Sequence, residues 1–226
     1  CSPMEMQLLG STIDDAAGEA FDKVSSILHL GYPGGPAIDK AARGGNPDAV
    51  KFPRSLLGGQ SLDFSFSGIK TAVLYHVNGV PGPKGPGGRK DGGHTDRPPR
   101  RHGPTRQRLE SQPSAGQGIE HFTPAALADV AASFQAAVVD VLRIKLRRAA
   151  RATAARTLIL GGGVAANSAL RQALTVLAQQ IGATLRMPEM RFCMDNAAMI
   201  AGLGYHYLRA GKVDDLSLTA QATVRR

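Results

Sequence analysis

The stretch LILGGGVAANSALRQAL, residues 158–174, decides the fold class. Its apolar start predicts a buried strand, its triple glycine a tight turn, and the remainder a helix. Without side chains at Gly161, Gly162 and Gly163, backbone amides can approach an anion, and the N-terminus of the following helix adds a favourable dipole. This order of elements predicts a phosphate-sized turn that handles a nucleotide.

The glycine turn matches neither of two common phosphate-loop motifs. It is not G-x-G-x-x-G and not G-x-x-x-x-G-K-[ST], so neither a dinucleotide-binding fold nor a P-loop ATPase is indicated. A purely structural turn stays open as the alternative. Asn167, at the start of the expected helix, carries a carboxamide that could cap the helix or hydrogen-bond a ribose or a phosphate.

Around this stretch, helical patterns alternate with short apolar segments, which predicts an α/β layer fold. Ser67 and Thr123 are expected to cap their helices, with Pro124 in the first turn and Gly211 closing the last helix. Helices are expected over residues 14–30, 37–43, 67–77, 124–151 and 195–210, and extended segments over 50–52, 62–66 and 184–187.

Residues 78–120 are rich in Gly, Pro, Arg, Ser and Gln and have almost no large apolar side chain. Such a segment buries too little surface to offset its chain entropy, so it is expected to be a disordered low-complexity insertion. The chain then divides into 1–77, the first part of an α/β ligand-binding region, and 121–226, a second α/β region with the glycine turn and a candidate metal carboxylate.

The chain is basic, with a formal net charge of +9 and a pI near 10.0. This balance favours a polyanionic partner such as nucleic acid, although the basic run at 143–156 could simply be a solvated face. Only Cys1 and Cys193 are present, which favours a reducing cytosol. No apolar run reaches the ~20 residues of a membrane span, so we expect a cytoplasmic protein with no membrane partner.

Asp195 stands at the expected start of the last helix, where an acid can be an N-cap or a metal ligand. Its nearest possible co-ligands in sequence are Cys193 and His206, and the latter lies three turns along the helix. One carboxylate does not make a metal site, so further ligands would have to come from elsewhere.

Acidic residues gather on the first expected helix, at Asp14, Asp15, Glu19 and Asp22. The first two suit the helix dipole, whereas Asp22 follows an apolar core position and is expected to face a cleft. The Tyr32–Pro36 loop offers bare backbone. Asp39, expected at the start of the next short helix, could join Asp22 in holding a ribose or an amino-acid head group.

The histidines show no metal-type pairing, and no nucleophilic hydrolase motif is present. Five runs in order, IDDAAGEAFDKV, YPGGP, LDFSFSGIKT, LGGGVAANSALR and FCMDNAAMIA, resemble the tRNA N6-adenosine threonylcarbamoyltransferase family. The resemblance implies an actin/Hsp70-like ATPase (ASKHA) fold. It also implies transfer of threonylcarbamoyl from threonylcarbamoyl-AMP to N6 of adenosine 37 in tRNAs reading codons that begin with A, one iron or zinc ion, and TsaB-like and TsaE-like partner proteins.

Carried over residue by residue, the resemblance implies substrate contacts at Asp22, Gly35, Asp39 and Asn167, and a metal ligand at Asp195. In the implied mechanism, the metal and the amides of the glycine turn hold and polarise the adenylate while the adenosine amine attacks and AMP leaves. The sequence identifies no general base.

This chain departs from the family pattern, because the H-x-x-x-H pair and a further glycine-rich loop do not occur in it. The chain starts with Cys and enters a helical pattern almost at once, so we expect a fold that is incomplete at the N-terminus. Because Asp195 without the histidine pair should bind a divalent ion weakly, we also expect that this chain alone holds no stoichiometric metal. Two hypotheses follow: an enzyme of this type, or a non-catalytic fragment with weak nucleotide or RNA binding. A carbamoyltransferase or sugar-kinase-like ATPase of the same fold is disfavoured by FDK, YPGGP and DFSFSG.

Overall fold

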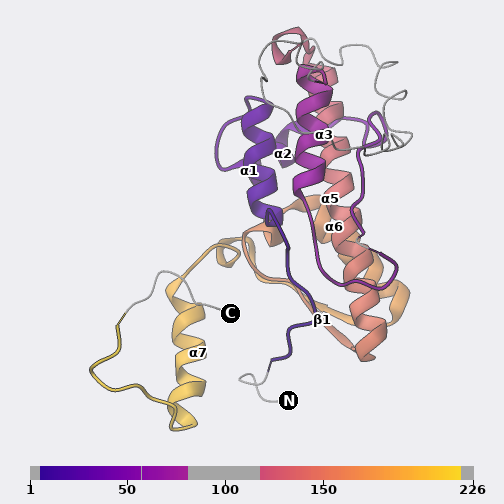
Figure 1. Ribbon diagram of the computed structural model, residues 1–226. Helices are drawn as coiled ribbons and strands as arrows, with labels where there is room; N and C mark the ends of the chain where they lie inside the picture. The colour runs from indigo at the N-terminus through magenta and orange to yellow at the C-terminus, as the bar shows by residue number, and fades with distance from the viewer. Residues whose placement is uncertain (1–5, 57, 81–117, 220–226) are drawn as a thin grey trace, which may run out of the picture.

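The computed structural model describes residues 6–56, 58–80 and 118–219 (Figure 1). Most of the expected insertion therefore lies outside the described residues. The elements are α1 (Ala17–Ile27), α2 (Gly34–Ala41), α3 (Ser67–Asn78), η1 (Ile119–His121), α5 (Pro124–Thr153), β1 (Thr157–Ile159), η2 (Gly163–Ala166), α6 (Ser168–Ile181), β2 (Thr184–Arg186), η3 (Met190–Phe192) and α7 (Ala197–Arg209).

The two strands, β1 and β2, pair in parallel, with Leu158 opposite Leu185 and α6 as the connection between them. Leu158 is buried against the end of α5 and against α6, whereas Ile159 is 79% exposed. The prediction of a buried strand is therefore correct for one face only. The segments expected to be extended at 50–52 and 62–66 form no strand, and only a single bridge joins Thr12 to Phe64.

The core is organised by α5, which begins as predicted. Thr123 accepts a hydrogen bond from the Ala126 amide, and Pro124 occupies the first turn, where a missing N–H does no harm. Phe134 on α5 meets Phe21 on α1 edge-on, with ring centroids 5.2 Å apart. Helices α1, α2 and α3 pack with α5 around one cluster of apolar side chains, so segments on both sides of residues 81–117 share a core.

By length and composition alone, α5 could cross a membrane, contrary to the expectation that no apolar run is long enough. Over half of its most apolar window, 56%, is buried inside the protein. This burial is typical of the central helix of a globular core, in which apolar residues cover more of the helix circumference.

The start of α3 is capped by a residue far away in sequence. Ser67 is the first helical residue and not the predicted N-cap, and Phe66 at the cap position provides no side-chain cap. Instead, the Asp14 carboxylate accepts hydrogen bonds from the Phe66 amide at 2.8 Å and the Ser67 hydroxyl at 2.7 Å. Desolvation raises the pKa of the Asp14 carboxyl. The hydrogen bonds from Phe66, Ser67 and the Ser65 hydroxyl outweigh it and hold this pKa at about 2.

Lys145 departs from the interpretation of residues 143–156 as a solvated basic face. Its side chain is 1% exposed, and its ammonium donates to the carbonyl oxygens of Leu56 at 2.7 Å and Ser61 at 2.6 Å. Burial lowers the pKa of this lysine. Lys145 therefore ties the 56–61 loop to α5 rather than facing solvent.

The last helix, α7, stands apart from the other helices (Figure 1), and none of its residues is buried. Its N-cap is Asn196, whose side chain accepts from the Met199 amide at 3.2 Å. The alternative that Asp195 caps this helix is therefore wrong. An Asn side chain meets the same requirement from one residue further along the chain.

Candidate functional site around the glycine turn

The glycine turn follows β1 directly, as the sequence predicts. Leu160 donates to the carbonyl of Arg186 on β2, and the chain then turns through three exposed glycines. Gly162 has a φ of 84°, in the region that favours glycine. Gly163 opens a four-residue 3-10 turn, η2, which leads to Asn167 at the start of α6, where the sequence predicts the helix to begin.

Asn167 is the N-cap of α6. Its Oδ1 accepts from the Leu170 amide at 2.9 Å, and its Nδ2 donates to Oε1 of Gln135 on α5 at 2.7 Å. Both side chains are buried, at 6% and 8% exposure. The capping role proposed for Asn167 is confirmed, and both ends of its carboxamide already have a protein partner. Gln135, which the sequence reasoning missed, fixes which end of that carboxamide faces α5.

Asp39 lies beside the start of α6, although it comes from α2. Its Oδ1 accepts from the backbone amide of Ser168 at 3.2 Å and from the Ser168 hydroxyl at 2.6 Å. Arg43 approaches its other oxygen only to 3.9 Å. Asp39 and Asn167, which the sequence placed in one site, are therefore brought together by Ser168. Asp39 sits in the second half of α2 and not at its start.

Asp22 holds the start of α2. Its carboxylate accepts from the Gly34 amide at 2.7 Å, so one oxygen caps α2, whose own N-cap residue, Pro33, makes no side-chain bond. A Cβ on Gly34 would lie 2.5 Å from the Asp22 Cα, which explains the glycine. A Cβ on Gly35 would meet nothing within 4 Å. Gly34 is thus required for packing, and Gly35 leaves an open stretch of backbone beside Asp22.

Asp15, which precedes α1, joins α1 to α3. Asp15 bonds the ammonium groups of Lys23 at 2.7 Å and Lys70 at 2.9 Å. The hydrogen bonds that Asp15 accepts from Lys23 and then from Lys70 lower its pKa. The hydrogen bonds that Lys23 donates to Asp15 and then to Glu19 raise the pKa of Lys23. The acidic cluster of the first helix is therefore mostly a structural junction between the IDDAAGEAFDKV and LDFSFSGIKT runs.

Asp195 is exposed, between the buried Cys193 and the helix cap Asn196. Over residues 6–56, 58–80 and 118–219, no three His, Cys, Asp or Glu side chains come together in a way that could hold a metal ion. The donors present therefore do not fit a resident metal by themselves. Asp195 can offer one ligand and no more.

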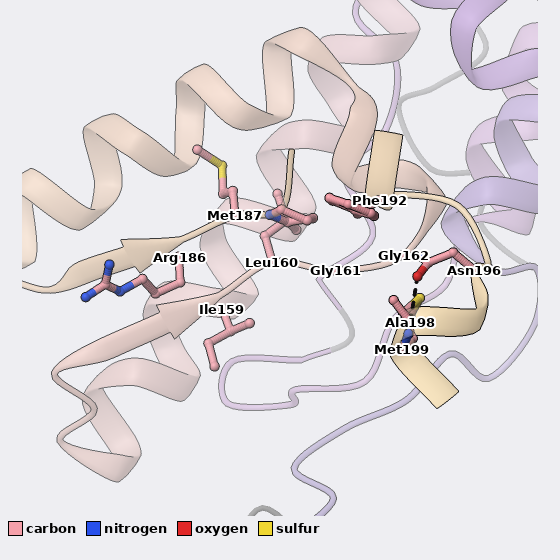
Figure 2. A pocket seen from close by; sticks show the side chains of 11 residues that line it. Ile159, Leu160, Gly161, Gly162, Arg186, Met187, Phe192, Asn196, Ala198 and Met199 are labelled. Carbon is pink, nitrogen blue, oxygen red and sulfur yellow. Dashed lines mark hydrogen bonds between the residues drawn. The ribbon is translucent and has the colours of Figure 1, made fainter. Parts of the chain in front are cut away.

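An open hollow of about 490 Å³ lies at the carboxyl ends of the two strands (Figure 2). Gly161 and Gly162 form one side of it, Phe192 comes from the segment that precedes α7, and Met199 comes from the first turn of α7. Asn196, which accepts a hydrogen bond from the Met199 amide, lines the hollow beside it. The wall is mostly apolar, and the polar side chains that line it are Arg186 and Asn196.

The described residues thus define an α/β protein whose parallel strands end at a glycine turn. A family model for tRNA N6-adenosine threonylcarbamoyltransferase (TsaD) matches residues 2–202, and the chain belongs to this family. Membership implies the ASKHA-like fold, and the parallel strand pair flanked by helices agrees with it.

Curated relatives agree with this assignment. The tRNA N6-adenosine threonylcarbamoyltransferase of Trichlorobacter lovleyi is 44% identical over 217 residues, covering 96% of this chain and 52% of that protein. Proteins of the same name from Clostridioides difficile and Thermomicrobium roseum are 41% and 45% identical, with coverage of 95% of this chain and 52% and 53% of theirs. The chain spans about half the length of the relatives it matches.

Proposed function

We propose that this chain supplies part of an enzyme that transfers the threonylcarbamoyl group from threonylcarbamoyl-AMP to N6 of adenosine 37 in tRNA. The observation that carries the proposal is the family match over residues 2–202, with 44% identity to a relative named for this reaction. The basic balance of the chain, +9, suits a tRNA substrate. In the reaction, the N6 amine attacks the carbonyl carbon, a C–N bond forms, the nitrogen loses one proton, and AMP leaves with the electrons of the broken C–O bond.

The residues proposed to hold the adenylate come from three helices that meet. Asp22 on α1 accepts a hydrogen bond from the start of α2, where Gly35 lies, and Asp39 reaches from α2 to the first residue of α6, beside Asn167. The glycine turn at 161–163 would offer backbone amides to the phosphate, since it has no side chains to block approach. The geometry supports a cradle for the nucleotide, in which Asp39 ties α2 to α6 and Asn167 ties α6 to α5.

The remaining parts of the site are proposed to come from the half of the family length that this chain does not match. The relatives extend well beyond it, with only about 52% of each covered. We propose that Asp195 contributes one ligand to a single divalent ion, iron or zinc, and that the other ligands lie outside this chain. The proposed setting is cytoplasmic, with TsaB-like and TsaE-like proteins as partners and no membrane.

The second candidate function is a non-catalytic fragment that keeps weak nucleotide or RNA binding. The observation favouring it is the absence, in the described residues, of any cluster that could hold a metal. On this view the chain folds around α5 and retains the α2–α6 contact but transfers nothing.

A chimera separates the two functions. This chain would replace the matching half of the Trichlorobacter lovleyi protein, and the product would be given threonylcarbamoyl-AMP, tRNA and the partner proteins, with modified nucleosides measured by mass spectrometry. Threonylcarbamoyladenosine formed by the chimera supports the enzyme. A folded chimera that binds AMP but forms none, beside an active parent protein, supports the fragment.

A further inference from the structure

Arg171, on the first turn of α6, joins segments that are separate in sequence. Its Nε donates to the carbonyl of Ala165 at 2.6 Å, just after the glycine turn. One terminal nitrogen donates to the carbonyl of Pro188 at 2.6 Å and contacts Sγ of Cys193 at 3.2 Å. A planar guanidinium presents its donors in a rigid fork, so these contacts fix direction as well as distance.

Cys193 completes this arrangement. Its side chain is 1% exposed, and its Sγ lies 3.6 Å from the carbonyl of Glu189, as a thiol donor would. The thiol thus donates a hydrogen bond to the carbonyl of Glu189 and accepts one from Arg171. Burying a thiol here seats the 188–193 segment against α6.

The two segments that Arg171 joins are the two sides of the hollow at the strand ends. Ala165 continues from the glycine turn on one side, and Pro188 belongs to the wall on the other. Asp195 follows Cys193 by two residues. A Cβ at Gly163 would meet Met194 Sδ at 3.4 Å, so the two sides already approach closely at that point.

No acidic side chain pairs with Arg171 among the residues that the structure describes. Its acceptors there are two backbone carbonyls and a thiol, in contrast to Arg54 and Arg143, which both reach Asp140. A guanidinium held by neutral acceptors gains less from charge pairing than one paired with a carboxylate. Its contribution lies in connecting the backbone at Ala165 to the 188–193 segment.

We propose that Arg171 is a positioning residue, which sets the spacing between the glycine turn and the Cys193–Asp195 segment. This inference rests on the proposed function only where the spacing is said to hold the adenylate. The structural role of Arg171 does not depend on it. Loss of the guanidinium should loosen the glycine turn and the 188–195 segment together, while the rest of the core stays folded.

The test uses Cys193 as the reporter, in a Cys1→Ser background that leaves it as the single thiol. Arg171→Met should raise the rate of modification by a thiol reagent on the order of 10- to 100-fold, because the lost bonds shift local opening by that factor. Arg171→Lys should fall between Met and the natural residue, since an ammonium cannot reproduce the fork. Amide exchange should rise at both 161–166 and 188–195.

The matched control is Leu174→Ala, which removes a buried side chain from the same helix. Rates are compared at denaturant concentrations giving equal global stability. Under the proposal, Arg171→Met exposes Cys193 far more than Leu174→Ala does. Equal reactivity in the two variants, or exchange that rises in only one of the two segments, would overturn it. AMP binding is not part of either readout, so failure of the proposed function leaves this result unaffected.

Discussion

The carboxylate of Asp39 on α2 accepts hydrogen bonds from both the amide and the hydroxyl of Ser168 on α6, 129 residues away. This contact bridges the two parts of the chain that flank residues 81–117. It also places Asp39 next to Asn167, the N-cap of α6. The proposed adenylate site depends on it, because the contact fixes α2 against the helix that follows the glycine turn.

Asp39→Ala should lower the free energy of unfolding by about 1–3 kcal/mol, because the Ser168 amide and hydroxyl lose a charged acceptor. Urea unfolding followed by circular dichroism measures the change. Arg43→Ala is the control, since Arg43 is 75% exposed on its side chain and 3.9 Å from Asp39. That variant should stay within about 0.5 kcal/mol of the natural chain. Equal losses of unfolding free energy in the two variants would show that the bonds from Ser168 are not what makes Asp39 stabilising.

Asp14 gives the fold a specific acid sensitivity. Its pKa is about 2 in the folded protein against an ordinary value of 3.8 for an aspartate, so the pKa is lowered on folding. Its contribution to stability is therefore complete above pH 3.8 and is lost as the pH falls towards 2. Asp14→Asn should make the dependence of unfolding free energy on pH shallower in this window. A slope unaffected by Asp14→Asn would refute the capping account of α3.

Asn196 and Asp195 should differ in their effect on α7. Asn196→Ala removes the cap bond to Met199 and should weaken the start of the helix by about 1 kcal/mol. Asp195→Ala should leave it intact, because the structure gives Asp195 no capping bond. Amide exchange over the first turn of α7 distinguishes the two. Faster exchange in Asp195→Ala than in Asn196→Ala would restore the discarded assignment.

The purified chain should hold no stoichiometric metal after dialysis. Asp195 is the one proposed ligand, and a lone carboxylate binds a divalent ion weakly. Elemental analysis by mass spectrometry measures iron and zinc per chain. One tightly bound ion would contradict the expectation. Loss of that ion in Asp195→Ala would then show that Asp195 binds it together with other ligands of this chain.

Features that depend on neighbouring residues could be predicted from the sequence. The Thr123 cap with Pro124, the glycine turn after β1 and the N-cap role of Asn167 were all predictable, because the groups involved lie within a few residues of one another. Each of these is decided by local hydrogen bonding and backbone sterics.

Features that depend on distant partners could not be predicted. Ser67 looks like a cap, yet the α3 start is capped by Asp14, 53 residues earlier. Lys145 sits in a basic run, but it is buried and its ammonium donates to the carbonyls of Leu56 and Ser61. Arg171 carries no local signal for its three contacts. Periodicity identifies the buried face of a helix, but not which polar groups a folded loop brings to that face.

The most direct test of the account is the amount of threonylcarbamoyladenosine formed by the chimera with the Trichlorobacter lovleyi protein, compared between Asn167→Ala and His206→Ala. Asn167 is buried with both ends of its amide bonded, whereas His206 lies on the exposed α7. The account predicts modification of tRNA by the chimera, strongly reduced by Asn167→Ala and little changed by His206→Ala. Equal losses in the two variants, or a folded chimera without activity beside an active parent, would contradict it.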